Sequence, residues 1–563
     1  MCRGRIHQSD VLRENSLSVD SLPIATPRVQ RPVIGSVTLS LIVALYLVFV
    51  TNRTFWSKAM EYLGAPSTAL FLLGIGLFSL FSAICVAVSV KYVTKPFFIL
   101  LIMIAAASSR FMDTFGTVID VDMIRNAAET TGSEAGHLIT AGFLTHMLLF
   151  GIVPSLLIML VRIKHRPFYQ KFKVNLVLVL CLLAVFTSVS IANVRTFAAT
   201  LRQHRDLVAT LNPVAPIFSA VRYVVAAGAD KNIVVQPLGT DARVIAPALS
   251  GKPRVTIIVA GETARAENFS LGGYARQTNP LLARQDIQYF TDTSSCGTAT
   301  AISLPCMFSV YPRSSYTHRK GLETENLLDV LSRAGIKTEW WENNTGSKGV
   351  ADRIAYTSFS DINDPRFCKN NECVDDVTLD GLGAWLDGVK GDSVLVIHQQ
   401  GSHGPAYYLR YPEKFRRFTP DCRTAELGNC SRQEIVNAYD NSILYTDYIL
   451  SAVIDMLKAR EAKLAGSMVY MSDHGESLGE RGLYLHGAPY FIAPSQQTHI
   501  PFVLWTGTET KAGIDRACLQ ATLNEPRSHD NLFHTVLGLM NVSTKVYEPS
   551  LDALVACRTR AAS

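Results

Sequence analysis

Long uncharged stretches in the first third of the chain constrain its fold most strongly. A helix needs roughly 20 apolar residues to cross about 30 Å of hydrocarbon. Five stretches meet or approach that length: Val33–Val50, Pro66–Val90, Pro96–Ser109, Leu138–Val161 and Val174–Val194. The third is the shortest, because Arg110 follows its apolar core, and a re-entrant or buried segment is the alternative for it. We therefore predict a membrane domain of five α-helices over residues 33–195.

Basic residues predict the orientation of these helices. The tail over residues 1–32 is polar, has no apolar core of the signal-peptide kind, and carries several arginines (Arg3, Arg5, Arg13, Arg28 and Arg31). The Lys91/Lys95 turn and the loop from Arg162 to Lys173 are also positive, and they alternate with mixed or acidic loops. The positive-inside rule places the basic set on the cytoplasmic side of the membrane. The chain beyond about residue 195 is then expected on the outer side.

Cysteine usage supports an exported domain. Eight of the 11 cysteines lie after the apolar stretches, and six form close pairs: Cys296/Cys306, Cys368/Cys373 and Cys422/Cys430. Close pairs of this kind predict disulfides, and Cys518 with Cys557 is a candidate fourth pair. Zinc binding by thiolates is the alternative, and no Cys-x-x-Cys repeat supports it. The net charge of +6 sits largely beside the membrane segments, so nucleic-acid binding is not indicated.

The second part of the chain has the pattern of an α/β domain. Residues 196–252 form a connector with an amphipathic helix expected at the membrane surface. From residue 253 to 563, short apolar runs alternate with amphipathic segments. The expected strands are Val255–Ala260, Ser393–His398, Ser467–Met471 and Pro501–Trp505, and the expected helices include Asn326–Ala334, Val377–Val389 and Glu434–Arg460. This alternation predicts a mostly parallel sheet with helices on both faces.

Two of the expected strands are followed by residues of the types that bind metals. The run from Met468 is followed by Asp473, His474 and Glu476, and the run from Val255 is followed by Glu262. Open α/β sheets bind ligands at the carboxyl ends of their strands, and carboxylate with imidazole suits zinc. The pattern therefore indicates a metal-assisted enzyme, with a simple turn cap as the alternative for Asp473 and His474.

A hydroxyl-rich loop supplies a candidate nucleophile. Cys296 and Cys306 enclose Thr298, Thr300 and Ser303, and a hydroxyl needs a metal or a base to react at neutral pH. The alternative is a structural Thr-rich loop. Three further polar residues follow strands or lie in Gly-rich turns, and together they would suit an anionic phosphoryl group: Lys348, His403 and His486.

Several long motifs resemble one family. They are GETARA at residues 261–266, NFSLGGYARQTNP at 268–280, SCGTAT at 295–300, PCMFS at 305–309 and DHGESLGE at 473–480. They are similar to the lipid A phosphoethanolamine transferases, which include the mobile colistin-resistance enzymes. The resemblance covers nearly the whole chain apart from the tail. It implies a five-helix anchor in the bacterial inner membrane and a periplasmic domain with the sulfatase-like fold of the alkaline phosphatase superfamily.

The resemblance also implies roles for individual residues. Thr300 corresponds to the nucleophile, and Glu262, Asp473 and His474 correspond to zinc ligands, with the Thr300 oxygen as the fourth. His403 and His486 correspond to residues that bind a second zinc or the phosphate. Four more positions correspond to substrate-binding or neighbouring residues: Asn126, Glu134, Lys348 and Glu476.

The implied reaction is a zinc-dependent transfer of phosphoethanolamine from phosphatidylethanolamine to a lipid A phosphate through a phosphothreonine-type intermediate. It would give resistance to polymyxin and other cationic peptides. Lipopolysaccharide core or periplasmic glucan is an alternative acceptor, and a glycerol-phosphate transferase is an alternative enzyme. The Cys/Ser-x-Pro-x-Arg string expected of a sulfatase nucleophile is absent. The non-enzymatic alternative is an inactive membrane sensor with the same fold.

Overall fold

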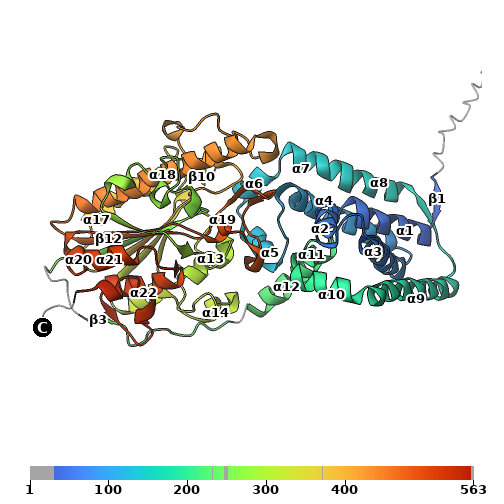
Figure 1. Ribbon diagram of the computed structural model, residues 1–563, viewed down its shortest axis with the longest axis horizontal. Coiled ribbons are helices and arrows are strands. Elements are labelled where there is room, and N and C mark those ends of the chain that lie inside the picture. The colour runs from blue at the N-terminus through green and yellow to red at the C-terminus, as the bar shows by residue number, and fades with distance from the viewer. Residues whose placement is uncertain (1–30, 231–232, 246–250, 371, 560–563) are drawn as a thin grey trace, which may run out of the picture.

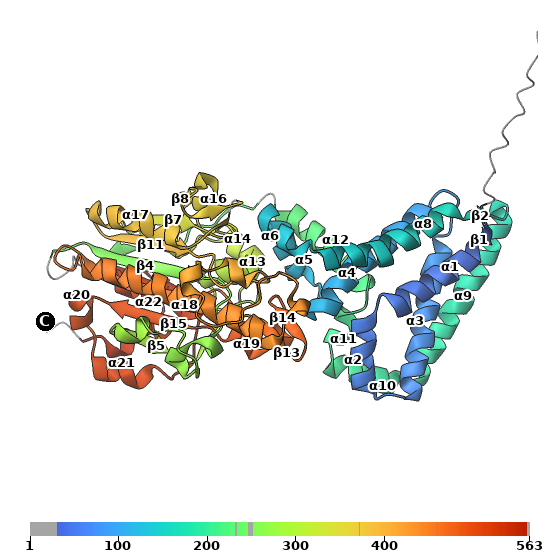
Figure 2. The ribbon, with the colours of Figure 1, turned by 90° about the horizontal axis from the view of Figure 1, so that it is seen from above.

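The computed structural model describes residues 31–230, 233–245, 251–370 and 372–559. A helical membrane domain and an α/β domain lie end to end along the long axis of the molecule (Figures 1 and 2). The predicted N-terminal tail, residues 1–32, falls almost wholly outside the described residues.

The membrane domain contains four helices that are long and apolar enough to cross a bilayer. They are α3 (Thr68–Ala87), α4 (Thr94–Phe115), the continuous run through α7 and α8 (Ala141–Leu160) and α9 (Phe168–Ala192). A fifth span arises if two bent segments count as one: Ser36–Val50 meets α2 (Arg53–Leu63) at 64°. The segment for which a re-entrant loop was the alternative is thus a single helix of 22 residues, whereas the bend after the first segment was not predicted.

Basic loops gather at the end of the bundle that is farthest from the α/β domain. Strands β1 (Val33–Gly35) and β2 (Arg162–Lys164) pair there (Figure 2). Lys95 Nζ donates hydrogen bonds of 2.9 and 2.7 Å to the carbonyl oxygens of Met159 and Val161, so the basic turn before α4 lies at the same end. This arrangement agrees with the orientation that the positive-inside rule predicts.

Short helices join the two domains. The connector contains α10 (Val194–Gln203), α11 (Asp206–Ala209) and α12 (Val214–Asp230). Between α4 and α7, helices α5 (Val121–Glu129) and α6 (Gly132–Leu138) lie against the α/β domain (Figure 1). The loop between α4 and α7 therefore contacts the α/β domain, which carries the predicted site residues.

The α/β domain is built on a seven-stranded sheet. In spatial order, its strands are β5 (Ile287–Phe290), β15 (Phe502–Thr506), β12 (Ala465–Ser472), β4 (Arg254–Gly261), β11 (Ser393–His398), β7 (Lys337–Glu342) and β8 (Ala355–Ser358). The five strands from β12 to β8 are parallel, as predicted, and β15 runs antiparallel to both of its neighbours. The four expected strands are present; β5, β7 and β8 were not predicted.

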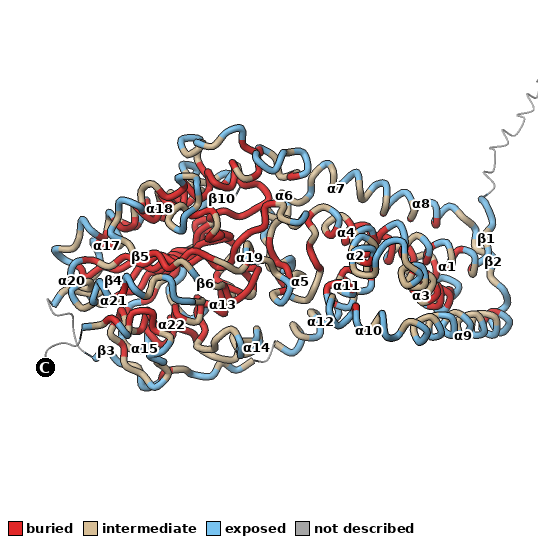
Figure 3. The backbone as a smooth tube through the Cα atoms, viewed as in Figure 1, coloured by how far each residue is buried: buried red, intermediate tan, exposed pale blue. Residues whose placement is uncertain are grey.

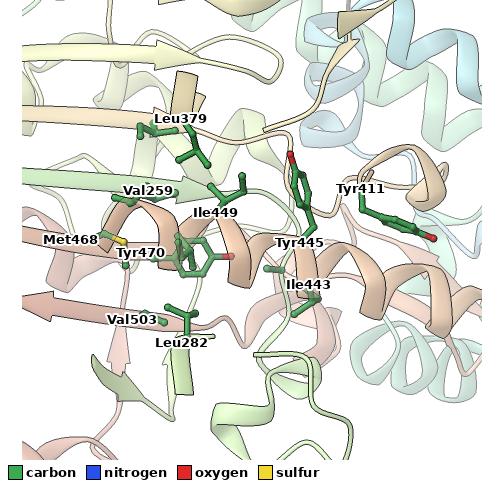
Figure 4. Close-up of a cluster of buried hydrophobic side chains, with 14 of the residues drawn as sticks. Val259, Leu282, Leu379, Tyr411, Ile443, Tyr445, Ile449, Met468, Tyr470 and Val503 are labelled. Carbon is green, nitrogen blue, oxygen red and sulfur yellow. The ribbon is translucent and has the colours of Figure 1, made fainter. Parts of the chain in front are cut away.

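Alternating side chains of the strands pack into two cores, one on each face of the sheet. Val259 and Tyr470 face α17 (Asp376–Asp387) and α18 (Arg432–Lys458), as the close-up of this core shows (Figure 4). Ile258 and Met471 face the opposite way, toward α13 (Thr300–Met307), α15 (Leu327–Arg333) and α22 (Asp530–Leu539). Burial is densest along the sheet (Figure 3). Packing on both faces makes the strand ends a rigid platform.

Four disulfides cross-link the α/β domain. The three predicted pairs Cys296–Cys306, Cys368–Cys373 and Cys422–Cys430 are confirmed, and the candidate pair Cys518–Cys557 is also bonded. The bonded thiols are therefore not ligands of a metal. Among the described residues, the free cysteines Cys85 and Cys181 lie in the membrane domain.

Candidate active site

The ends of two neighbouring parallel strands create a buried cluster. β4 and β12 pair with Gly261 opposite Ser472, so Glu262 and Asp473 leave the sheet side by side. The Asp473 amide donates to the Gly261 carbonyl oxygen at 2.9 Å and holds the two ends together. His474 follows directly. The side chains of Glu262, Asp473 and His474 each offer a ligand atom, and these atoms lie within 4.8 Å of one another.

The chemistry of this cluster fits a divalent cation. Glu262 is 1% exposed, and Asp473 and His474 are fully buried. Burial, and then the charge of Asp473, raise the pKa of Glu262 well above its ordinary value, because two carboxylates share a dry site. Asp473 Oδ2 has no hydrogen-bond partner among the described residues. A cation would satisfy both features.

His474 is prepared to act as a neutral ligand. Burial lowers its pKa to about 4, so the uncharged imidazole prevails. Nδ1 lies 2.9 Å from the Gly475 carbonyl oxygen, which assigns the proton to Nδ1 and leaves the lone pair on Nε2. Nε2 faces the carboxylates, 3.3 Å from Asp473 Oδ2 and 3.6 Å from Glu262 Oε1. Two carboxylates and one imidazole form a donor set suited to zinc.

Thr300 is the hydroxyl that faces the cluster. Its Oγ1 lies 3.3 and 3.2 Å from the two Glu262 carboxylate oxygens and 3.4 Å from His474 Nε2. It is the first residue of α13. The other two hydroxyls of the loop are engaged elsewhere: Thr298 Oγ1 donates to the Ala488 carbonyl oxygen at 2.6 Å, and Ser303 Oγ donates to the carbonyl oxygen of Asp473. The sequence left Thr298 as a competitor, and the geometry favours Thr300.

A histidine that the sequence analysis did not select fixes this loop in place. His529 Nδ1 accepts a 3.0 Å hydrogen bond from the Cys296 amide, and Nε2 donates to the Ser472 carbonyl oxygen at 2.8 Å. The loop is thus attached to the end of β12 just before Asp473 and His474. No motif surrounds His529, so its role is visible only in three dimensions.

The predicted phosphate-binding histidines lie beside the cluster. The His486 ring lies 4.5 Å from the His474 ring and 5.5 Å from the His403 ring, centroid to centroid. His486 Nδ1 is 2.9 Å from Glu476 Oε2, and Tyr407 donates to Glu476 Oε1 at 2.6 Å. Burial alone would lower the pKa of His486, but the Glu476 charge and hydrogen bond outweigh it and raise that pKa. Glu476 therefore supports His486 through its Nδ1 atom.

His403 connects the cluster to the membrane domain. Its Nε2 lies 3.0 Å from Oε1 of Glu134, on α6. Burial would raise the pKa of Glu134, but the His403 charge and hydrogen bond bring it to about 2, so Glu134 is ionised. The backbone of the loop that carries His403 lies very close to Glu262 at Gly401, whose φ is +55°. A Cβ atom added to Gly401 would lie only 2.7 Å from the Glu262 carbonyl oxygen. Only glycine suits that position.

Lys348 and Asn126 complete the set of predicted residues. We use the term rim for the residues that surround the cluster where the two domains meet: Glu129, Glu134, Lys348, His403 and His486. Lys348 Nζ is 3.6 Å from Glu129 Oε2 on α5 and donates to the Thr345 carbonyl oxygen at 2.8 Å. Asn126 is also on α5; its carbonyl oxygen accepts from the Thr130 hydroxyl, and in the described part of the chain its side chain makes no hydrogen bond. The structure thus brings Lys348 and Glu134 to the rim, whereas no hydrogen bond among the described residues joins the Asn126 side chain to the cluster.

Comparisons with known proteins agree with this architecture. A sulfatase family model matches residues 254–542, and a model described as phosphoethanolamine transferase EptA/EptB matches residues 77–227. Phosphoethanolamine transferase EptA of Salmonella typhimurium is 38% identical over 540 residues, which cover 94% of this chain and 98% of that protein. Phosphatidylethanolamine transferase Mcr-1 of Escherichia coli is 36% identical, with 89% and 94% covered. The integral membrane lipooligosaccharide phosphoethanolamine transferase A (EptA) of Neisseria meningitidis is 37% identical and superposes with a TM-score of 0.90, covering 94% of this chain and 99% of that structure.

Proposed function

This chain belongs to the phosphoethanolamine transferase family of EptA and Mcr-1, and we propose that it moves phosphoethanolamine from phosphatidylethanolamine to a phosphate of lipid A through a covalent intermediate on Thr300. The chain is an integral membrane protein with a periplasmic catalytic domain. Membership of an enzyme family removes the inactive sensor as an alternative. The donor, the acceptor and the intermediate are our proposal.

One observation carries the proposal. A single hydroxyl oxygen, Thr300 Oγ1, lies 3.2–3.4 Å from Glu262 and His474, at the start of α13 and inside a disulfide-closed loop. Rigid placement of a nucleophile removes much of the entropic cost of reaction. Glu262, Asp473 and His474 would hold zinc, with Thr300 Oγ1 completing four donors. Zinc bound there supplies a positive charge that lowers the pKa of the hydroxyl and stabilises its alkoxide.

The proposed transfer has two half-reactions. In the first, Thr300 Oγ1 forms a bond to the phosphorus of phosphatidylethanolamine while the bond from phosphorus to the glycerol oxygen breaks. In this step the Thr300 hydroxyl loses its proton, and the glycerol oxygen of the departing diacylglycerol gains one. In the second, a phosphate oxygen of lipid A bonds to the same phosphorus, the Oγ1–phosphorus bond breaks, and Thr300 regains a proton from the acceptor.

The rim supplies groups that recognise both ends of phosphoethanolamine. His486 is held by Glu476 through Nδ1, which leaves Nε2 to bind a phosphate oxygen, and His403 lies next to it. Glu134 uses Oε1 for His403, whereas Oε2 is buried and lacks a hydrogen-bond partner among the described residues. A buried, ionised carboxylate oxygen without a partner is a suitable acceptor for the ethanolamine ammonium. We therefore propose that Glu134 binds the ammonium while His403 and His486 bind the phosphate.

The product explains a cellular role. Each transferred group adds an ammonium to an anionic lipid surface, and a less anionic surface attracts cationic peptides such as polymyxin less strongly. Mass spectrometry of lipid A and core sugars from cells with and without the protein tests the acceptor. We expect lipid A to gain phosphoethanolamine with the wild-type protein and not with Thr300→Ala. Modified core or glucan alongside unmodified lipid A would contradict the proposed acceptor.

A further inference from the structure

Behind Glu262 lies a buried row of polar side chains that crosses three neighbouring strands. β7, β11 and β4 are adjacent and parallel, with His398 opposite Glu342 on one side and Ala260 on the other. Glu262 directly follows Gly261, the last residue of β4, so it lies just beyond this edge of the sheet. Glu342, His398 and Glu262 are each at most 2% exposed.

Asn344 joins this row to the metal-binding carboxylate. It follows β7 by two residues, and its Nδ2 donates a 2.6 Å hydrogen bond to Glu262 Oε2. The same nitrogen lies 3.3 Å from His398 Nε2. His398 Nδ1 in turn lies 3.0 Å from both oxygens of Glu342. Glu342 Oε1 also accepts a 2.7 Å hydrogen bond from the backbone N–H of Asn344, which closes the network.

The contacts define one consistent set of hydrogen positions. Glu342 accepts from His398, which places the imidazole proton on Nδ1 and leaves Nε2 as an acceptor. His398 Nε2 then accepts one hydrogen of the side-chain nitrogen Nδ2 of Asn344, and Glu262 accepts the other. Both hydrogens of Nδ2 are used, so the side-chain amide cannot rotate without losing two buried hydrogen bonds. Glu262 is thereby held in one orientation before any cation binds.

We propose that Asn344 is a positioning residue for the metal site, and that His398 and Glu342 hold it in place. The inference rests on the proposed function, because it assigns Glu262 as a zinc ligand. Hydrogen bonds to a metal ligand fix its orientation, and their loss typically lowers metal affinity 10- to 100-fold. Asn344 does not touch the reacting atoms in this arrangement; it acts through Glu262.

Zinc affinity of the purified full-length protein tests this role. The protein is stripped of metal and titrated with Zn²⁺ against a competing chromophoric chelator. We expect Asn344→Ala to bind Zn²⁺ about 10- to 100-fold more weakly than wild type, with activity recovering as Zn²⁺ is raised. Glu342→Gln should also weaken Zn²⁺ binding, but by a smaller factor. Gln keeps an acceptor for the backbone N–H of Asn344 but loses the negative charge beside His398.

Asn343→Ala is the matched control. Asn343 is the preceding residue and is also buried, but its side chain donates to the Cys373 carbonyl oxygen and to Asp375 instead of Glu262. It should bind Zn²⁺ like wild type, and circular dichroism of the metal-free proteins reports whether each variant folds. Wild-type affinity in folded Asn344→Ala and Glu342→Gln would overturn the inference and leave the proposed function intact. Failure of the wild-type protein to bind Zn²⁺ would overturn both.

Discussion

The active site has two parts that are built in different ways. The cluster of Glu262, Asp473 and His474, together with Thr300 that faces it, comes entirely from the α/β domain and is buried at the ends of paired strands. The rim around it is shared: Glu134 and Glu129 come from the membrane domain, and they contact His403 and Lys348. The cluster is thus fixed by the sheet, whereas the rim is complete only when the outer loop of the membrane domain lies on the α/β domain.

This difference assigns different tasks to the two parts. Sheet register is set by many hydrogen bonds and by a packed core, so the cluster can hold a metal and a nucleophile with little freedom. The rim depends on a few ion pairs between domains, and interfaces of that kind permit relative motion. We therefore expect changes in the cluster to abolish chemistry, and changes in the rim to weaken the use of lipid substrates while leaving the metal bound.

The largest effect should come from the proposed nucleophile. Thr300→Ala removes the oxygen that we propose forms the covalent bond, and we expect transfer to fall by at least about 1,000-fold. Transfer is measured with purified protein, phosphatidylethanolamine and lipid A. Thr298→Ala is the control, because that hydroxyl is engaged with the Ala488 carbonyl oxygen, and it should retain most activity. Equal losses in both variants would contradict the assignment of Thr300.

The next largest effect should come from a carboxylate that we propose binds the metal. Asp473→Asn removes one of two buried charges, and we expect the purified protein to lose its zinc together with at least about 100-fold of its activity. Elemental analysis measures the metal, and chelation of the wild-type protein should reproduce the loss of activity. A variant that loses activity but keeps a full complement of zinc would show that Asp473 is not a ligand.

A change at the rim should separate binding from metal retention. Glu134→Gln removes the charge that we assign to the ethanolamine ammonium, and we expect a loss of about 10- to 100-fold in kcat/KM for phosphatidylethanolamine with unchanged zinc content. Glu525→Gln, at an exposed carboxylate paired with Arg527, serves as the control. If Glu134→Gln lost zinc as readily as Asp473→Asn, the division of the site into two parts would be wrong.

The smallest effect concerns docking of the domains. Glu372 lies 3.0 Å from His137 on α6 and 3.3 Å from Arg410, whose Nε donates to the His403 carbonyl oxygen. Burial would raise the pKa of Glu372, but these partners lower it to about 2. Because the folded pKa lies below the ordinary value of 4.5, the ion pairs contribute stability above pH 4.5 and lose it as the pH falls toward 2.

Thermal unfolding across this pH range measures that contribution. Glu372→Gln should destabilise the protein by about 1 kcal/mol at pH 7, after allowance for solvent screening. The difference from wild type should shrink progressively below pH 4.5. A difference that is constant with pH would mean that the Glu372 charge does not contribute.

Much of this architecture was predictable because it depends on local pattern. Apolar length marked the membrane helices, close spacing marked the disulfides, and the polar residues after Met471 and Ala260 marked the cluster. Parallel strands bring their carboxyl ends to one edge, so the side chains of Glu262 and Asp473 could be expected to meet.

The remainder depends on three-dimensional neighbours. Strand β7 reads KTEWWE, and its charged residues obscure the apolar pattern of a core strand. The antiparallel direction of β15 is not encoded in its own residues. Asn344, His398 and His529 are single polar residues whose importance comes from contacts with distant segments. The contact between Glu134 and His403 requires two domains to dock, which no spacing predicts.

Peptide mapping of the intermediate tests the central claim most directly. Purified full-length protein is incubated with phosphatidylethanolamine in the absence of acceptor, digested and examined by mass spectrometry. The account predicts one added phosphoethanolamine group on Thr300, lost when lipid A is supplied and absent after zinc is stripped. An adduct on another residue, an adduct that forms without metal, or no adduct while transfer proceeds would contradict it.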